Sequence, residues 1–83
     1  MNRIDLDGRM LTRTEEGHAY IQQMLRFPDY YGNNLDALFD LLTEVSTDVE
    51  ILINHSNEMD ERIKKVFLNA SVENECVNII LTK

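Results

Sequence analysis

Several residue types are scarce in this 83-residue sequence, which contains one cysteine, one proline, three glycines and no tryptophan. A single cysteine, Cys76, excludes an internal disulfide and favours a cytoplasmic protein. No apolar run approaches the roughly 18 residues that a membrane span needs. The N-terminal stretch MNRIDLDGRM lacks the apolar segment of a signal peptide. We therefore expect one cytoplasmic domain, residues 1–83, that does not bind a membrane.

Basic residues are absent from a long central segment. Between Arg26 and Arg62 there is no lysine or arginine, whereas residues 27–61 hold nine of the fifteen acidic residues. The net charge of the chain is -7. This sign disfavours nucleic acid and anionic membranes as ligands and favours a basic protein partner. Solubility alone is the simpler explanation of an acidic balance, so the pattern of the segment has to decide between the two.

Motifs for catalysis or metal binding are also missing. A lone cysteine next to a strand, such as Cys76, is usually a small buried hydrophobe, and nothing in the sequence places His18 or His55 beside it. The histidines have no metal-ligand spacing. Asp36 and Asp40 on one helix face are more simply explained as surface charge than as an acid–base pair. We predict a protein that is not an enzyme and needs no cofactor; a small hydrolase using Cys76 is the least favoured alternative.

The rest of the chain alternates between strand and helix patterns. Short apolar-rich runs predict three strands, and apolar residues at helical spacing predict three helices. The strands are expected at Asn2–Leu6, Val49–Asn54 and Val77–Leu81, and the helices begin near Arg13, at Leu35 and after Ser56 or Asn57. The order strand, helix, helix, strand, helix, strand predicts an α/β domain. Its three-stranded parallel sheet is packed by helices, with Val49–Asn54 central.

Local signals predict how the first two helices begin. Thr12 followed by Glu15 matches a capping box for the first helix. Asn33 or Asn34 can cap the second helix, and we favour Asn34. Gly32 can take the positive φ of a turn between the tyrosines and this helix. The side of the first helix that faces the core is expected to contain His18, Ile21, Met24 and Leu25.

The segment FPDYYGNNLDALFDLLTEV, residues 27–45, combines aromatic and acidic residues. Leucines at helical spacing form the apolar side of its helix. The opposite side is then expected to hold Asp36, Phe39, Asp40, Thr43 and Glu44. Carboxylates four residues apart repel one another by roughly 0.2–0.5 kcal/mol per pair, which is too little to prove a function. Of the adjacent Tyr30 and Tyr31, one is expected to be buried and the other exposed, and the sequence leaves open which.

This segment resembles the signature of the barstar family, the intracellular inhibitors of secreted ribonucleases of the barnase type. The pattern YYG-N-LDAL-D carries the resemblance, and VFLNASVENECVNIIL, residues 66–81, is similar to the family's last helix and strand. The resemblance implies three parallel strands packed by helices, in agreement with the order above. It also implies an immunity protein that forms a 1:1 complex with a basic ribonuclease, whose active site is blocked by the second helix and the loop before it.

The resemblance also implies which residues contact the partner. Asp40 matches the carboxylate that occupies the phosphate-binding pocket of the enzyme, and Glu44 is added as a rim carboxylate that speeds association. Phe39 stands where the best-known member of the family has tryptophan. The expected contact residues are Tyr30, Tyr31, Gly32, Asn34, Asp36, Phe39, Asp40, Thr43, Glu44 and Glu73. The alternative is a barstar-like protein-binding module whose partner is not a ribonuclease.

Overall fold

The structure, a computed structural model, describes residues 2–29 and 31–83. Its elements are β1 (Asn2–Asp7), a 3-10 turn η1 (Gly8–Leu11), α1 (Thr14–Leu25), α2 (Leu35–Thr43), β2 (Val49–Asn54), a 3-10 turn η2 (Ser56–Glu58), α3 (Glu61–Glu73) and β3 (Val77–Leu81). The strands form one parallel sheet in the order β1-β2-β3. The predicted α/β fold, with β2 in the centre of the sheet, is therefore confirmed.

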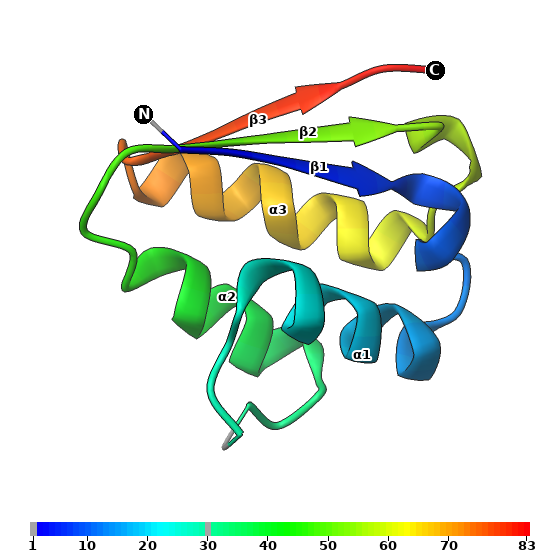
Figure 1. The fold of residues 1–83 in the computed structure, drawn as a ribbon, viewed down its shortest axis with the longest axis horizontal. Coiled ribbons are helices and arrows are strands. Elements are labelled where there is room, and N and C mark those ends of the chain that lie inside the picture. The colour runs from blue at the N-terminus through cyan, green and yellow to red at the C-terminus, as the bar shows by residue number, and fades with distance from the viewer. Residues whose placement is uncertain (1, 30) are drawn as a thin grey trace.

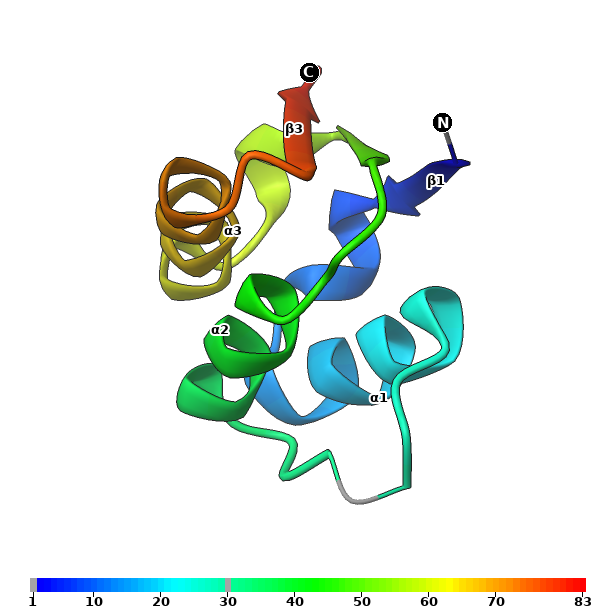
Figure 2. The same ribbon diagram turned by 90° about the vertical axis from the view of Figure 1, so that its left-hand side faces the viewer.

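All three helices lie on one side of the sheet (Figure 1). Helix α3 lies next to the strands, and α1 and α2 lie farther from them, as the view turned by 90° also shows (Figure 2). Burial alternates along the central strand, as expected for a sheet with helices on one side. Val49, Ile51 and Ile53 of β2 are buried, while the residues between them are half-buried. The helices contribute to the same core with Ile21, Leu38, Leu42, Ile63 and Phe67. Helix α2 is thus an outer element whose inner side rests on α3.

The first helix does not begin with the predicted capping box, so that prediction is wrong. Helix α1 starts at Thr14, and its N-cap residue Arg13 makes no side-chain cap bond. Thr12 instead ends the 3-10 turn η1, which begins because the Asp7 carboxylate accepts a hydrogen bond from the Arg9 N–H at 2.9 Å. Thr12 is therefore not available to cap α1, because it belongs to the end of the turn that Asp7 caps.

One of the core positions predicted for α1, near its C-terminal end, is not buried. His18 and Ile21 are buried as expected, but Met24 is 37% exposed, so its prediction is wrong. The helix ends at Leu25 because Arg26 adopts the left-handed conformation with φ 55°. The chain leaves the helix before Pro28 is reached, and Met24 stays on the outside of the last turn.

The third helix begins later than the sequence indicated. Ser56 and Asn57 belong to η2, a short 3-10 turn that follows β2, so neither caps α3. Asp60 caps it instead: its carboxylate accepts the Arg62 N–H at 2.8 Å and pairs with the Arg62 guanidinium at 3.0 Å. The polar residues after β2 thus turn the chain, and the cap follows once that turn is complete.

Candidate partner-binding site

The N-terminal end of α2 is fixed by the residue predicted to cap it. The Asn34 side-chain oxygen accepts the Ala37 N–H at 2.8 Å, and its amide donates to the carbonyl of Gly32 at 3.2 Å. The left-handed conformation in this loop belongs to Asn33, with φ 51°, and not to Gly32, whose φ is not positive. A positive φ at Gly32 is therefore wrong. Asn33 takes this conformation instead, because asparagine tolerates it better than most residues.

The loop before α2 is anchored to α1 through Tyr31. This side chain is 4% exposed, and its hydroxyl is hydrogen-bonded to Nδ1 of His18, which is 2% exposed. The Tyr31 ring also packs on Phe27, with ring centroids 5.2 Å apart. Tyr31 is thus the buried one of the two tyrosines, and Tyr30 lies outside the described residues.

Burial determines the protonation of this pair. It raises the pKa of Tyr31 to about 12 and lowers the pKa of His18, so the phenol keeps its proton and the imidazole is neutral. Among the described residues, His18 Nδ1 is the only hydrogen-bond partner of the phenol oxygen. A buried O–H without an acceptor is costly, so Tyr31 donates to Nδ1 and His18 carries its own proton on Nε2.

The acidic side chains of α2 are exposed, as predicted. Asp36, Asp40 and Glu44 follow one another four residues apart, and within residues 2–29 and 31–83 no salt bridge reaches them. Lysine and arginine do form ion pairs elsewhere, at Arg3–Asp5, Arg9–Asp7, Arg62–Asp60 and Lys64–Glu61. The carboxylates of α2 therefore keep their charge available for another molecule.

Phe39 and Thr43 are less exposed than the acidic residues beside them. Both are half-buried, and Phe39 packs against the core. The Thr43 hydroxyl donates to the carbonyl of Asp40 at 2.9 Å, within the helix. The outward side predicted for α2 thus consists of its carboxylates, with Phe39 and Thr43 at its edges.

A surface hollow of about 220 Å³ joins the loop to α2. Four of the expected contact residues line it, namely Tyr31, Gly32, Asp40 and Glu44. Its remaining lining comes from Ala37 and Leu41, which sequence reasoning did not assign to the site because leucine spacing placed Leu41 on the core side. Apolar surface next to two carboxylates suits a side chain that has an apolar stem and a cationic end.

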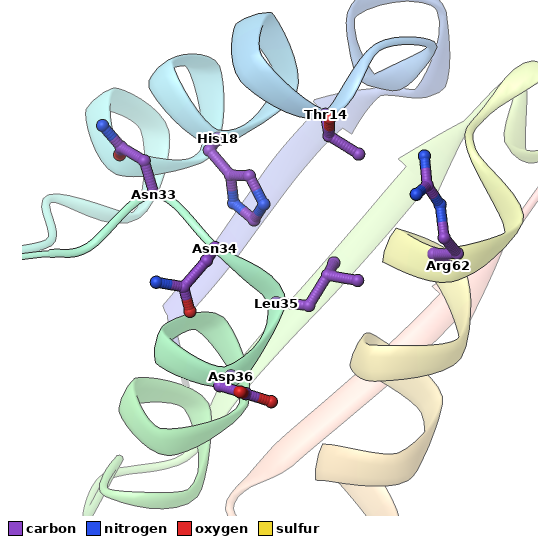
Figure 3. Close-up of a pocket in the computed structure, with 7 residues that line it drawn as sticks. All are labelled: Thr14, His18, Asn33, Asn34, Leu35, Asp36 and Arg62. Carbon is purple, nitrogen blue, oxygen red and sulfur yellow. The ribbon is translucent and has the colours of Figure 1, made fainter.

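A second hollow, of about 460 Å³, lies where the N-terminal ends of the three helices meet (Figure 3). Asp36 lines it together with Arg62, and the His18 ring points from α1 toward the start of α2 (Figure 3). The Arg62 guanidinium is itself paired with Asp60 at 3.0 Å, so the hollow lies between a carboxylate of α2 and an ion pair at the start of α3. The residues lining this hollow are Thr14, His18, Asn33, Asn34, Leu35, Asp36 and Arg62.

Glu73, the last residue of α3, is brought to the opposite end of α2. The next residue, Asn74, donates from its side-chain amide to the carbonyl of Leu42 at 2.9 Å and to that of Val45 at 2.8 Å. No local pattern in the sequence indicates that Asn74 has a partner 32 residues away. The exposed Glu73 carboxylate thus belongs to the same end of the molecule as Glu44.

Comparison with known proteins agrees with the fold. A family model described as "Barstar (barnase inhibitor)" matches residues 1–72. The chain belongs to the barstar family. A protein of Bacillus subtilis (strain 168) named "Putative ribonuclease inhibitor YrdF" is 51% identical over 43 residues. That match covers 52% of this chain and 47% of the relative, about half the length of each.

The described part of this barstar-family chain holds no group of three or more histidine, cysteine, aspartate or glutamate side chains arranged to bind a metal. None of its helices has both the length and the apolar composition needed to cross a membrane. Cys76 is a free, half-buried thiol just before β3, and its backbone N–H donates to the Asn74 side chain at 3.0 Å. The features that distinguish the surface are therefore the carboxylates of α2 and the hollow beside them.

Proposed function

We propose that this barstar-family chain is a cytoplasmic inhibitor of a basic ribonuclease. In a 1:1 complex, α2 and the Tyr-Tyr-Gly loop before it block the active site of the enzyme. The observation that carries the proposal is the set of exposed carboxylates on α2, which have no salt bridge in the described part of the chain. Two of them, Asp40 and Glu44, border an apolar hollow. The family description and the name of the Bacillus relative both refer to ribonuclease inhibition.

Asp40 is assigned the central role. The active site of a ribonuclease carries cationic side chains that hold the phosphates of RNA. A carboxylate held among them accepts charge-assisted hydrogen bonds and excludes the substrate. Asp40 lines the hollow with Tyr31 and Leu41, so the stem of an arginine or lysine from the enzyme has apolar surface to cover while its charged end reaches the carboxylate. Gly32 has no side chain to keep the partner away.

The remaining acidic residues are assigned to the encounter. Residues 27–61 contain nine acidic residues and no lysine or arginine. A field of this sign steers a cationic enzyme toward α2 and raises the association rate, more so at low salt. Fast capture is what an immunity protein needs, because the nuclease has to be bound before it reaches cellular RNA.

Two side chains on either side of Gly32 are held in place before the partner binds. Asn34 caps α2 at its start, and the Tyr31 hydroxyl ties the loop to His18 of α1. Side chains and loops that are already ordered lose less conformational entropy when a complex forms. The loop and α2 therefore favour binding by presenting their charges in one arrangement.

The test is a titration of ribonuclease activity. Barnase and other ribonucleases with basic active sites are mixed with increasing amounts of the purified chain, and RNA cleavage is followed. We expect the cleavage rate of at least one enzyme to fall to zero at one equivalent. An acidic control protein of the same net charge should leave the rate unchanged at equal concentration and salt. If an excess of the chain leaves every enzyme active and a different protein binds α2, the function is that of a binding module with another partner.

A further inference from the structure

The C-terminal end of α2 is held by a side chain that comes from outside the helix. The side-chain amide nitrogen of Asn74 donates to the carbonyls of Leu42 and Val45, and the carbonyl of Thr43 lies 3.3 Å from the same nitrogen. Carbonyls in the last turn of a helix have no partner within the helix itself. Asn74 adds a donor for the Leu42 carbonyl, which also accepts the Val45 N–H at 3.4 Å, and supplies a donor for the connection that follows α2.

The orientation of the Asn74 amide is determined by its other contacts. Its side-chain oxygen accepts the Cys76 N–H at 3.0 Å. Its own backbone N–H donates to the carbonyl of Ala70 at 2.9 Å, and its carbonyl accepts the Val77 N–H at 3.1 Å. Every polar group of the residue is thus engaged. The two amide protons have to face α2, since the oxygen is already directed at the start of β3.

These contacts connect parts of the chain that are far apart in sequence. Asn74 is separated by 29 to 32 residues from the carbonyls that it binds. In the described part of the chain, no other side-chain hydrogen bond joins α2 or its C-terminal connection to a distant element. The position of α3 relative to the end of α2 therefore depends on this one amide in addition to apolar packing.

We propose that Asn74 is a positioning residue for the inhibitory surface, an inference that rests on the proposed inhibition of a ribonuclease. Glu73 directly precedes it and is exposed, as are the carboxylates at the end of α2. By joining the two helix ends, Asn74 fixes the backbone at Glu73 relative to the backbone at Glu44 before the enzyme arrives, and so restricts the space that the two carboxylates share. The two acidic segments then meet the cationic enzyme as one surface, without the entropy loss of ordering them during binding.

The test combines two substitutions with barnase as the probe, or with another ribonuclease that the chain is found to inhibit. In the natural background, Glu73→Gln should weaken inhibition roughly two- to fivefold, the effect of a rim charge. In an Asn74→Ala background, Glu73→Gln should cause no further loss, because the carboxylate is no longer held in place. Asn74→Ala alone should weaken inhibition about tenfold, within the range for coupled contacts. Asn78→Ala, an exposed asparagine of β3, is the matched control and should change neither value.

A second variant separates positioning from stability. Asn74→Asp keeps the acceptor for the Cys76 N–H and replaces the donors to α2 with an oxygen that repels the same carbonyls. Its added negative charge would by itself favour a basic enzyme, so weaker inhibition by a folded Asn74→Asp protein supports the positioning role. If Glu73→Gln has the same effect with and without Asn74, the inference is refuted.

Hydrogen exchange of the free protein gives a measurement that needs no enzyme. In the Asn74 variants we expect the amides of residues 43–45 to lose protection while those of β2 keep it. A uniform loss over the whole chain would assign Asn74 to stability alone and overturn the inference. Local loss of protection in a chain that inhibits no ribonuclease would instead refute the proposed function and leave the coupling of the helix ends intact.

Discussion

Acidification should destabilise this domain through His18. The imidazole is 2% exposed, and burial lowers its pKa below the ordinary value of 6.5. The folded protein therefore binds fewer protons than the unfolded chain once the pH falls below about 6.5. The stability that comes from keeping His18 neutral is fully present above that pH. It is lost as the pH drops toward the lowered pKa of the folded state.

The expected size follows from proton counting. One group that is protonated in the unfolded chain and neutral in the folded one changes the free energy of unfolding by at most about 1.4 kcal/mol per pH unit. The contact with Tyr31 adds a physical reason for the cost. A second proton on the imidazole has to sit on Nδ1, which displaces the Tyr31 O–H. A buried hydroxyl without an acceptor costs about 1–3 kcal/mol.

The two carboxylates with lowered pKa values act in a different pH range. Hydrogen bonds from the Arg9 and Arg62 side chains lower the pKa values of Asp7 and Asp60 below 3.8. For a carboxylate with a lowered pKa, the stabilisation is present above its unfolded value and is lost only as the pH falls below it. Between pH 7 and pH 5 these carboxylates should therefore not contribute to the slope, and we assign it to His18, the buried histidine.

Urea denaturation at a series of pH values between 7.5 and 5 measures this effect. The free energy of unfolding should fall with pH in the natural protein, whereas His18→Gln should remove the slope because glutamine accepts the Tyr31 O–H and does not titrate. His55→Gln is the control, since the His55 side chain is 42% exposed and pairs with Glu58, and it should keep the slope. A free energy of unfolding that stays constant from pH 7 to pH 5 in the natural protein would refute the reasoning.

Four further substitutions test other parts of the structure. Asp40→Ala should weaken ribonuclease binding by several kcal/mol, the effect of leaving cationic groups of the enzyme unpaired; calorimetry that finds its affinity equal to the natural one would remove Asp40 from the assigned role. Glu44→Gln should slow association and reduce its salt dependence with little change in dissociation, and stopped-flow mixing at two salt concentrations checks both. Gly8→Ala should lower the free energy of unfolding by about 1–3 kcal/mol or more, because its Cβ would lie 2.3 Å from the carbonyl oxygen of His55. Gly32→Ala should lower the free energy of unfolding by less, since the atom nearest to its Cβ, at 3.0 Å, belongs to the Asn34 side chain. Thermal denaturation of both variants measures the two losses, and equal losses would contradict this explanation.

The order and pairing of the strands were predictable because each strand carries its own apolar pattern. Val49, Ile51 and Ile53 alternate along β2, and the helical connections between strands require parallel pairing. The Asn34 cap was predictable for a similar reason, since its hydrogen bond to the Ala37 N–H spans three residues.

Competing local signals explain the wrong helix starts. Thr12 has the right residue three positions later, but the earlier turn capped by Asp7 includes it. In the same way Ser56 lies in the turn after β2, and Asp60 takes the cap. A single sequence shows every residue that could cap a helix, but it does not show which of the competing caps the folded chain uses.

The contacts that hold the site together were not predictable from local patterns. Tyr31 and His18 are 13 residues apart, and Asn74 and Leu42 are 32 residues apart. Each of these contacts depends on how α1 and α3 pack beside α2, which no spacing within one helix reveals. The resemblance to the barstar family named the expected contact residues, and it did not indicate the side chains that support them.

The nine-residue length of α2 limits how far its role can be transferred to a smaller molecule. A helix of about two and a half turns has too few internal hydrogen bonds to offset the cost of nucleation in water. Here it is kept folded by Leu38 and Leu42 in the core and by asparagine side chains at its two ends. A synthetic peptide of residues 31–44 would lack the Asn74 amide, the His18 ring and the surface of α3. It would spend most of its time as a random coil, so a peptide mimic of this surface would need chemical staples in place of the domain.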